Sequence, residues 1–199
     1  MKAFAAATAV SVLLLAGCSA TGGAEGAPEG VPSAAAPAAE VEGVLAAHGL
    51  AGKSTMEIID QLDRLGLDAR PAGLKASVRP HELLLSSGAR EYRLAVPPDR
   101  FYLSVAPYAD RTHDCFHHSL TTCKGELAAV TVQVRVVDET HDRVLLDEAR
   151  TTFDNGFVGL WLPRDIEGVL RVSYAGKTGE TRFATTADAP TCLTTLQVV

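Results

Sequence analysis

The sequence has no cluster of lysine and arginine, and its 18 basic residues are outnumbered by 24 acidic ones. The resulting net charge of −6 excludes nucleic acid as the partner and also excludes attachment through a basic membrane-surface patch. The motifs Gly-x-Ser-x-Gly and His-Glu-x-x-His and a phosphate-binding loop are missing, so hydrolytic chemistry has no support. The apolar fraction of 47% nevertheless rules out a fully disordered chain, and 199 residues fit one ordinary domain or two small ones.

Long apolar runs are also scarce, and the one that approaches membrane length follows Lys2 directly. This run, residues 3–15, has the layout of a secretory signal and is too short for a stable transmembrane span. It leads into Leu-Ala-Gly-Cys at residues 15–18, which resembles the lipobox of bacterial lipoproteins; an ordinary signal peptide that happens to end near a cysteine is the alternative. We therefore expect a lipoprotein signal peptide over residues 1–17, lipid on Cys18, and an extracytoplasmic protein anchored to the bacterial cell membrane, where disulfides are permitted.

The next segment, residues 18–39, consists mainly of Ala, Gly, Pro and Glu without apolar periodicity, which predicts a flexible tether. From residue 40 the apolar spacing predicts a helix that stops at Gly49. Ser-Thr-Met-Glu at residues 54–57 has the form of a capping box and predicts a second helix, closed by Gly66. Short alternating runs follow from Val78 onward, so we expect a small α+β domain over residues 40–100.

The remaining residues, 101–199, read as nearly all strand. Four valines alternate at residues 130–136, and Asp-Asn-Gly at 154–156 predicts a tight turn. Further short apolar runs recur at the spacing of a β-sandwich, the last of them over residues 193–199. The predicted fold class is therefore α+β: a small N-terminal α+β domain followed by a mostly antiparallel, β-sandwich-like C-terminal domain.

Cysteine is rare, and its distribution is the main functional clue. Apart from Cys18 there are three cysteines, Cys115, Cys123 and Cys192, and an odd number is informative in an oxidising compartment. Residues 113–123 contain two of them together with half of the six histidines. The segment lies between two predicted strands, so we expect an exposed connecting loop. Cys192 comes near the start of the last predicted strand, so it also falls at a sheet end.

Two interpretations of this cluster stay open on residue types alone. One is a plain disulfide between Cys115 and Cys123, worth roughly 2.5 kcal/mol for so short a loop. The other is a metal site, because thiolate with imidazole selects Zn²⁺, Cu(I) or an iron–sulfur cluster over Mg²⁺ or Ca²⁺. The paired Cys-x₂₋₄-Cys spacing of structural zinc is absent, which favours Cu(I). His117 and His118 tip the balance toward metal, although adjacent side chains of an extended segment point to opposite faces.

At these residues the sequence resembles the CueP family of periplasmic copper-binding proteins. The resemblance runs from Phe101 to the C-terminus. The motifs that carry it are Phe-Tyr-Leu-Ser-Val-Ala-Pro-Tyr at 101–108, the segment 115–126, Asp-Asn-Gly-Phe at 154–157, Trp-Leu-Pro-Arg-Asp at 161–165 and Pro-Thr-Cys-Leu-Thr-Thr at 190–195. It implies two domains per subunit, a homodimer, and three cysteines that bind copper and take part in its reduction.

Carried over by position, the resemblance implies that Cys115, Cys123 and Cys192 are the catalytic and metal-binding cysteines, with His118 as the favoured histidine ligand. The implied function is copper sequestration for resistance or delivery, with copper as Cu(I) or Cu(II) and a copper-dependent enzyme as a possible recipient. The competing interpretations are a thiol–disulfide oxidoreductase, which lacks the expected Cys-x-x-Cys, and a structural β-sandwich lipoprotein with one disulfide.

Overall fold

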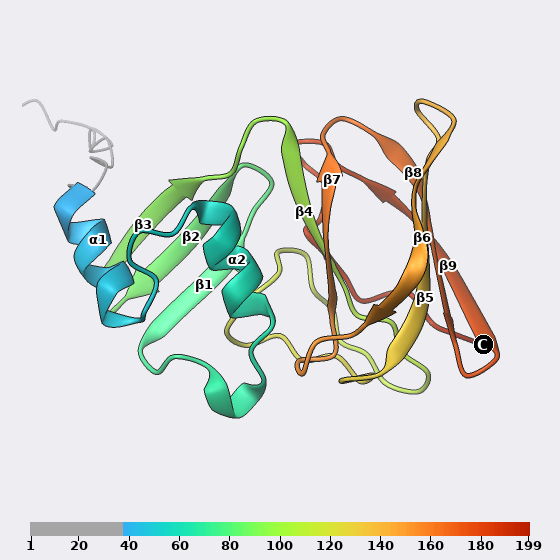
Figure 1. Cartoon of the computed structure of the whole chain (residues 1–199), viewed down its shortest axis with the longest axis horizontal. Coiled ribbons are helices and arrows are strands. Elements are labelled where there is room, and N and C mark those ends of the chain that lie inside the picture. The colour runs from blue at the N-terminus through green and yellow to red at the C-terminus, as the bar shows by residue number, and fades with distance from the viewer. Residues whose placement is uncertain (1–37) are drawn as a thin grey trace, which may run out of the picture. The chain divides into compact units, whose positions relative to one another are not determined.

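The computed structural model describes residues 38–199, so the predicted signal peptide, Cys18 and nearly all of the tether lie outside the described residues. Two α-helices and a short 3₁₀ helix precede ten strands (Figure 1). The helices are α1 (Ala38–Ala47), α2 (Thr55–Asp63) and η1 (Leu67–Ala69). The strands are β1 (Leu74–Val78), β2 (Glu82–Ser87), β3 (Arg90–Ala95), β4 (Arg100–Val105), β5 (Thr131–Asp138), β6 (Arg143–Thr151), β7 (Val158–Pro163), β8 (Glu167–Tyr174), β9 (Lys177–Ala184) and β10 (Cys192–Leu193). The α+β class is confirmed.

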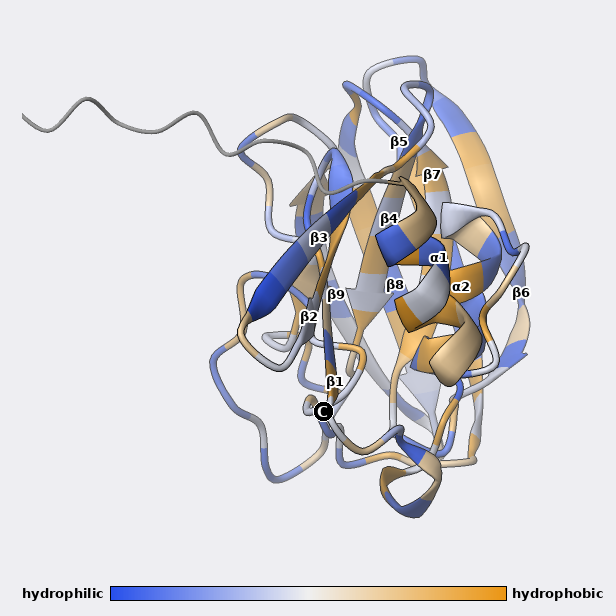
Figure 2. Cartoon of the chain, turned by 90° about the vertical axis from the view of Figure 1, so that its left-hand side faces the viewer, coloured by the Kyte–Doolittle hydropathy of each residue, from blue (hydrophilic) through white to orange (hydrophobic). Residues whose placement is uncertain are grey.

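The helices pack on a small antiparallel sheet of order β1-β2-β3. The predicted capping box starts α2: the Ser54 side chain accepts the Glu57 N–H, and the Glu57 carboxylate accepts the Ser54 N–H at 2.8 Å. Ile58, Ile59 and Leu62 then face the sheet and are fully or almost fully buried. The outermost strand, β3, is largely hydrophilic (Figure 2), as suits an edge strand open to water.

The β-rich part consists of two sheets that face each other across a shared core. One sheet has the order β10-β4-β7, and the other has the order β6-β5-β8-β9. The alternating valines of β5 point Val132, Val134 and Val136 into this core, as their period of two requires. All pairs of neighbouring strands are antiparallel except β10 with β4, which run parallel over two residues.

Strand β4 joins the two parts because both of its faces are buried. Phe101, Leu103 and Val105 point into the core between the sheets, whereas Tyr102 and Ser104 point toward α2. Alternation of side chains along a strand allows one strand to serve two cores in this way. A chain segment that leaves the end of β4 therefore starts at the boundary between the helical layer and the sandwich.

Three expectations about element bounds need correction. Helix α2 ends at Asp63, three residues before Gly66, with Arg64 as its C-cap. Residues 74–78 form a strand that precedes the first predicted strand. The sequence does not reveal it, because it has only five residues and one of its three buried positions is a small alanine. The last strand covers only Cys192–Leu193; the residues after it pair with the body irregularly, through backbone hydrogen bonds to Tyr108 and Thr178, and bury Leu196 and Val198 in the sandwich core. Among the described residues, no helix has the length and apolar character that a membrane crossing requires.

Candidate metal centre

The long connection between β4 and β5, residues 106–130, carries most of the candidate ligands. Its middle part runs beside β1: the Val78 N–H donates to the His118 carbonyl at 2.8 Å, and the Leu120 N–H donates to the Ala76 carbonyl at 2.9 Å. His118 and Leu120 have no exposed surface. The expectation of an exposed loop is therefore wrong for these residues, because the segment adds an irregular strand to a sheet edge and is covered there.

Cys192 reaches this connection through the parallel pairing of β10 with β4. That pairing places Cys192 opposite Ser104, next to the point where the connection leaves the sheet. The N–H groups of Thr191 and Cys192 both donate to the Phe116 carbonyl, at 2.9 and 3.2 Å. The Thr191 hydroxyl accepts the His118 N–H at 3.0 Å. Two segments about seventy residues apart are thus held side by side directly after Cys115.

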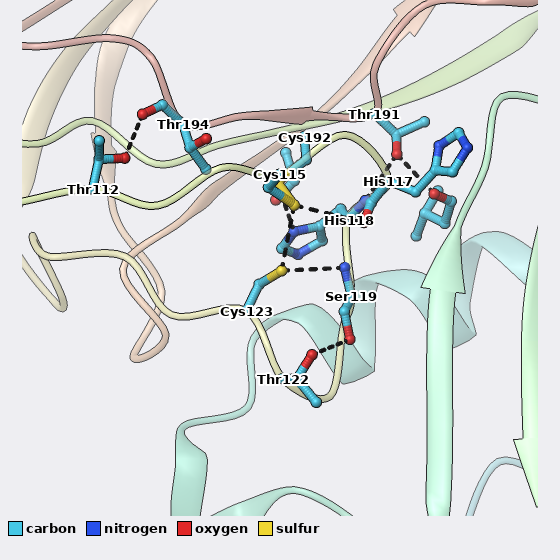
Figure 3. The surroundings of a disulfide bond; sticks show 12 residues. Thr112, Cys115, His117, His118, Ser119, Thr122, Cys123, Thr191, Cys192 and Thr194 are labelled. Carbon is cyan, nitrogen blue, oxygen red and sulfur yellow. Dashed lines mark hydrogen bonds between the residues drawn. A yellow bond between two sulfur atoms is a disulfide. The ribbon is translucent and has the colours of Figure 1, made fainter.

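Four of the predicted site residues form one compact cluster, shown in Figure 3. One ligand atom from each of Cys115, His118, Cys123 and Cys192 lies within 4.8 Å of all the others. The Cys115 and Cys123 Sγ atoms are 3.5 Å apart, and His118 Nδ1 lies 3.6 Å from Cys192 Sγ. All three described cysteines and one histidine therefore meet at the interface of connection, sandwich and helical layer.

The disulfide of this cluster joins Cys115 to Cys192, and Cys123 is the free thiol. The structure therefore does not contain the local Cys115–Cys123 disulfide that the sequence left open as one interpretation. The reason lies in the fold, because β10 brings the Cys192 backbone against residue 116, and the Cys115 and Cys192 Cα atoms lie 5.7 Å apart. That separation is in the normal range for bonded cysteines.

The side chains of the adjacent His117 and His118 point in opposite directions (Figure 3). His118 turns its ring toward the sulfurs, whereas His117 points away from them (Figure 3). The His118 ring also packs against Phe157, with ring centroids 4.5 Å apart. Opposite orientations are what an extended backbone imposes on neighbouring side chains, so the cluster contains one imidazole.

Comparison with known proteins identifies the family. The family model described as "Periplasmic copper-binding protein CueP" matches residues 57–197, more than half of the chain. The crystal structure of S.CueP is 44% identical with a TM-score of 0.76, and the match covers 82% of this chain and all of that one. The chain belongs to the CueP family. No curated protein matches the chain.

For a CueP-family protein, the donor set fits the copper that the family description names. Sulfur and imidazole nitrogen are soft or borderline ligands, which copper prefers over carboxylate oxygen. The Asp63 carboxylate contacts Nε2 of the His118 ring, on the side opposite the nitrogen that faces the sulfurs. The periplasmic family description also agrees with the expectation of an extracytoplasmic protein that can keep a disulfide.

Asp63 holds the His118 ring in place through a contact with its Nε2 atom. Its fully buried carboxylate lies 2.7 Å from His118 Nε2 and accepts further hydrogen bonds from Tyr102, Ser104 and Asn155 at 2.6, 3.1 and 2.9 Å. A carboxylate on one ring nitrogen fixes the ring and leaves the other nitrogen for a metal. In this CueP chain the free nitrogen is Nδ1, the one that faces the sulfurs.

The charges of the site depend on this pair. Burial lowers the pKa of His118, but the charge of Asp63 and its hydrogen bond outweigh burial and raise the pKa from 6.5 to about 9. Burial raises the pKa of the Cys123 thiol, but the hydrogen bond and charge of His118 outweigh it and lower the net pKa. The metal-free site therefore favours imidazolium beside thiolate. A metal ion must displace the Nδ1 proton in order to bind there.

Sequence reasoning missed Asp63 and the second role of Asn155. Asp63 follows Ile59 by four residues and so falls on the apolar stripe of α2, where a carboxylate requires buried partners; that spacing is the signal that could have found it. Asn155 was predicted only as a turn residue. It lies in that turn, but it is also buried and donates to the backbone and side chain of Asp63.

A groove of about 750 Å³ gives solvent access to two of the sulfur-bearing residues. It is lined by Cys115 and Cys123 together with charged side chains that include Arg111, Lys124 and Glu126. Cys192 does not line it and is only 2% exposed. The cluster therefore has an open side, toward Cys115 and Cys123, and a closed side, toward Cys192 and His118.

Proposed function

We propose that this CueP-family protein binds copper through Cys115, Cys123, Cys192 and His118 Nδ1. The single observation that carries the proposal is the convergence of these four ligand atoms within 4.8 Å. Copper is the cargo here, and the sulfurs of Cys115 and Cys192 become available to it as thiolates once their disulfide is reduced. Three thiolates and one imidazole offer more donors than Cu(I) needs, so a bound ion can exchange among them without leaving the site.

We further propose that the cysteines reduce Cu(II). Two thiols that form a disulfide release two electrons and two protons, and each Cu(II) takes up one electron. One turn therefore converts two Cu(II) ions to two Cu(I) ions and joins Cys115 to Cys192. The presence of that disulfide beside a remaining thiol supports this step, because it is the oxidised product that the reaction would leave. An external thiol reductant must then restore the pair.

The protein's location and partners belong to the same proposal. Lipid on Cys18 would tether the copper domain to the outside of the cell membrane through residues 18–39, so that the site meets copper before the ion enters the cytoplasm. Sequestration at that point would protect the cell, and transfer to a copper-dependent enzyme would use the same open groove. A homodimer is expected from the family. Mass spectrometry of the membrane fraction tests the anchor, because an acylated Cys18 at the mature N-terminus has a distinct mass.

Copper titration of the reduced protein tests the ligand set. Competition against a chromophoric Cu(I) chelator should show Cu(I) bound far more tightly than Zn²⁺. Cys123→Ser and Cys192→Ser should each weaken Cu(I) binding by more than about tenfold, since each removes a thiolate from the same ion. The matched control is His117→Asn, which alters the neighbouring histidine that points away and should leave affinity unchanged.

Two outcomes would contradict the proposal. A preference for zinc over Cu(I) would overturn the copper assignment of this site. Unchanged Cu(I) affinity in Cys192→Ser would reduce the site to a local one around Cys115 and Cys123. For the reduction step, Cu(II) added without oxygen should lose its paramagnetic resonance signal while two thiols disappear for every two Cu(I) ions formed. Retention of all three thiols would exclude the cysteines as the electron source.

A further inference from the structure

The single tryptophan of the sequence lies against a buried tyrosine. Trp161 of β7 is directly opposite Tyr102 of β4, the neighbouring strand (Figure 1). The centroids of the two rings are 4.7 Å apart, and the ring planes are inclined at 56°. Tyr102 is 2% exposed, whereas Trp161 is only partly buried. Because an electron can pass between two aromatic rings in contact, the pair connects the solvent with the interior of the protein.

Each of the two rings has a carboxylate of helix α2 at its polar atom. The Tyr102 hydroxyl donates to Asp63 at 2.6 Å, and the Trp161 indole N–H donates to Asp60 at 2.9 Å. Asp60 and Asp63 are three residues apart, so they lie on the same face of the helix. Gly159 leaves room for the tyrosine hydroxyl, because a Cβ at this position would collide with it. A negative charge beside each ring favours the loss of an electron from that ring.

A buried phenol is readily oxidised only if its proton has an acceptor. Burial and, after it, the charge of Asp63 raise the pKa of Tyr102 well above its ordinary value, so the hydroxyl keeps its proton in the resting protein. Loss of an electron makes a phenol strongly acidic. The Asp63 carboxylate at 2.6 Å is placed to take up the proton without any movement of the chain. Oxidised Tyr102 would therefore be a neutral radical, which brings no new charge into the interior.

We propose that Trp161 and Tyr102 form a one-electron relay, which takes up an oxidising equivalent at the surface and stores it on the buried tyrosine. A strong one-electron oxidant in the solvent, such as an oxidising radical, removes one electron from the Trp161 indole. Tyr102 then gives one electron to Trp161 and its hydroxyl proton to Asp63. The external oxidant is reduced by one electron, Trp161 is restored, and Tyr102 is left as a tyrosyl radical beside a protonated Asp63.

The relay goes beyond the proposed function, because neither copper nor a cysteine takes part in it. A cysteine pair gives up two electrons when it forms a disulfide, whereas the relay moves a single electron. Its inner end nevertheless adjoins the candidate metal centre. One carboxylate oxygen of Asp63 contacts Tyr102 at 2.6 Å, and the other contacts His118 at 2.7 Å. Relay and copper site are thus separate in chemistry and share one buried carboxylate.

Flash photolysis of the metal-free protein tests the relay. The oxidant is ruthenium(III) tris-bipyridine, produced by a laser flash in the presence of a cobalt(III) quencher, and Cys123→Ser is the parent protein, so that no free thiol competes. The absorption of the indole radical should appear first and decay at the rate at which the tyrosyl absorption rises. Tyr102→Phe should abolish the tyrosyl signal and prolong the indole radical, and Trp161→Phe should remove most of the tyrosyl signal.

The matched control is Tyr92→Phe, because Tyr92 is also buried and donates to a carboxylate, that of Glu40 at 3.0 Å, but lies in another sheet. Its kinetics should equal those of the parent protein. Asp63→Asn should slow the conversion of indole radical to tyrosyl radical by at least about tenfold, since an amide is a poor base. Heavy water, which requires no variant, should also slow this conversion, because a proton moves with the electron.

Three results would overturn the relay and leave the copper proposal intact. The first is an indole radical that lives equally long in the parent protein and in Tyr102→Phe. The second is an unchanged tyrosyl yield in Trp161→Phe, which would mean that the oxidant reaches a tyrosine directly. The third is loss of the tyrosyl signal in Tyr92→Phe. Equal conversion rates in ordinary and heavy water would exclude Asp63 as the proton acceptor.

Discussion

The connection 106–130 and the β5–β6 hairpin that follows it are opposites in structure. The hairpin is paired over eight positions with one register shift, between Val136 and Val137, and its strand β6 is mostly exposed. The connection has almost no regular structure, yet His118 and Leu120 within it are fully buried. Regularity and burial are therefore separate properties in this protein. The site is built where the backbone is irregular, since an irregular backbone can turn side chains from several segments toward one point.

The two regions also differ in what holds them. Hairpin order comes from hydrogen bonds between neighbours in sequence, supplemented by surface ion pairs such as Arg135 with Asp147. The connection is held by distant partners: β1, Asp63, Thr191 and the disulfide to Cys192. We therefore expect substitutions around the connection to be costly and those in the hairpin to be mild.

The disulfide should contribute most. Its sequence separation is 77 residues, for which the chain-entropy model gives about 4.5 kcal/mol of stabilisation. Reduction of the metal-free protein should lower the free energy of unfolding by about that amount in urea denaturation. An oxidised Cys192→Ser protein, bridged only across the eight-residue separation of Cys115 and Cys123, should retain roughly 2.5 kcal/mol of disulfide stabilisation. Equal stabilities of the reduced and oxidised proteins would contradict the role assigned to the long bridge.

The second largest loss of stability should follow from removal of the buried Asp63 carboxylate. Asp63→Ala leaves the His118 charge and the Tyr102 hydroxyl without a partner, so we expect a loss of about 3–5 kcal/mol. Asp63→Asn, which keeps the shape and some hydrogen bonds, should lose less. Denaturation of the metal-free, oxidised protein measures both. A second readout separates positioning from mere stability: the ¹⁵N shifts of His118 should change in Asp63→Asn, because the partner of Nε2 is altered.

Local chemistry explains which parts of the fold could be predicted from the sequence. The capping box of α2 involves Ser54 and Glu57, three residues apart, and it was confirmed. The alternating valines of β5 likewise reveal their buried face without knowledge of any partner strand. These features depend only on neighbours along the chain. The resemblance to the CueP family, confirmed by the comparisons, rested in the same way on contiguous motifs.

The arrangement of the site depended on contacts that spacing cannot reveal. Cys192 reaches Cys115 through a parallel pairing of only two residues, too short to have a periodic signature. Asp63 reaches His118 across 55 positions, from the end of a helix in another layer. Three cysteines allow three pairings, and only the folded backbone selects Cys115 with Cys192. The residues of the cluster could thus be predicted, whereas the disulfide pairing and the buried Asp63 could not.

A buried leucine sharpens the comparison within the apolar core. Leu120→Ala in the connection should cost about 3 kcal/mol, because the side chain is fully buried against the helical layer. Leu145→Ala in β6 is the matched control, since the same atoms are removed from a side chain that is only partly buried. Urea denaturation should show a clearly smaller loss for the control. Comparable losses would mean that the connection is no better packed than the hairpin.

The pH dependence of stability should expose the Asp63–His118 pair. His118 has a pKa of about 9 in the fold, above its ordinary 6.5, so its contribution is complete below about pH 6.5 and disappears as the pH rises through 9. The lowered pKa of Asp63, for which burial opposes the larger combined effect of His118 and the hydrogen bonds, makes its contribution disappear on acidification. The Cys123 thiol titrates in the opposite sense, so the Cys123→Ser background is used.

In that background the free energy of unfolding should fall between pH 6.5 and pH 9, by less than the roughly 3 kcal/mol of the full shift, because Cys123 also helps to raise the pKa of His118. The matched control is His118→Gln in the same background, which keeps a side-chain donor for Asp63 but has no proton to lose. Its stability should stay nearly flat over this range. If the control loses stability over the same pH range, the titrating group is not His118. His118 would then not be an imidazolium in the metal-free site.

The smallest effect should come from the surface of the hairpin. Asp147 in β6 interacts with Arg135 and Gln133 of β5, and the Arg135 and Asp147 side chains are both about two-fifths exposed. Exposed ion pairs contribute at most about 1 kcal/mol, because water screens the charges and side-chain entropy opposes the contact. Asp147→Ala should therefore change the free energy of unfolding by less than about 1 kcal/mol and leave Cu(I) affinity untouched. A loss comparable to that of Asp63→Ala would abolish the contrast between the two regions, because a solvent-facing carboxylate would then matter as much as a buried one.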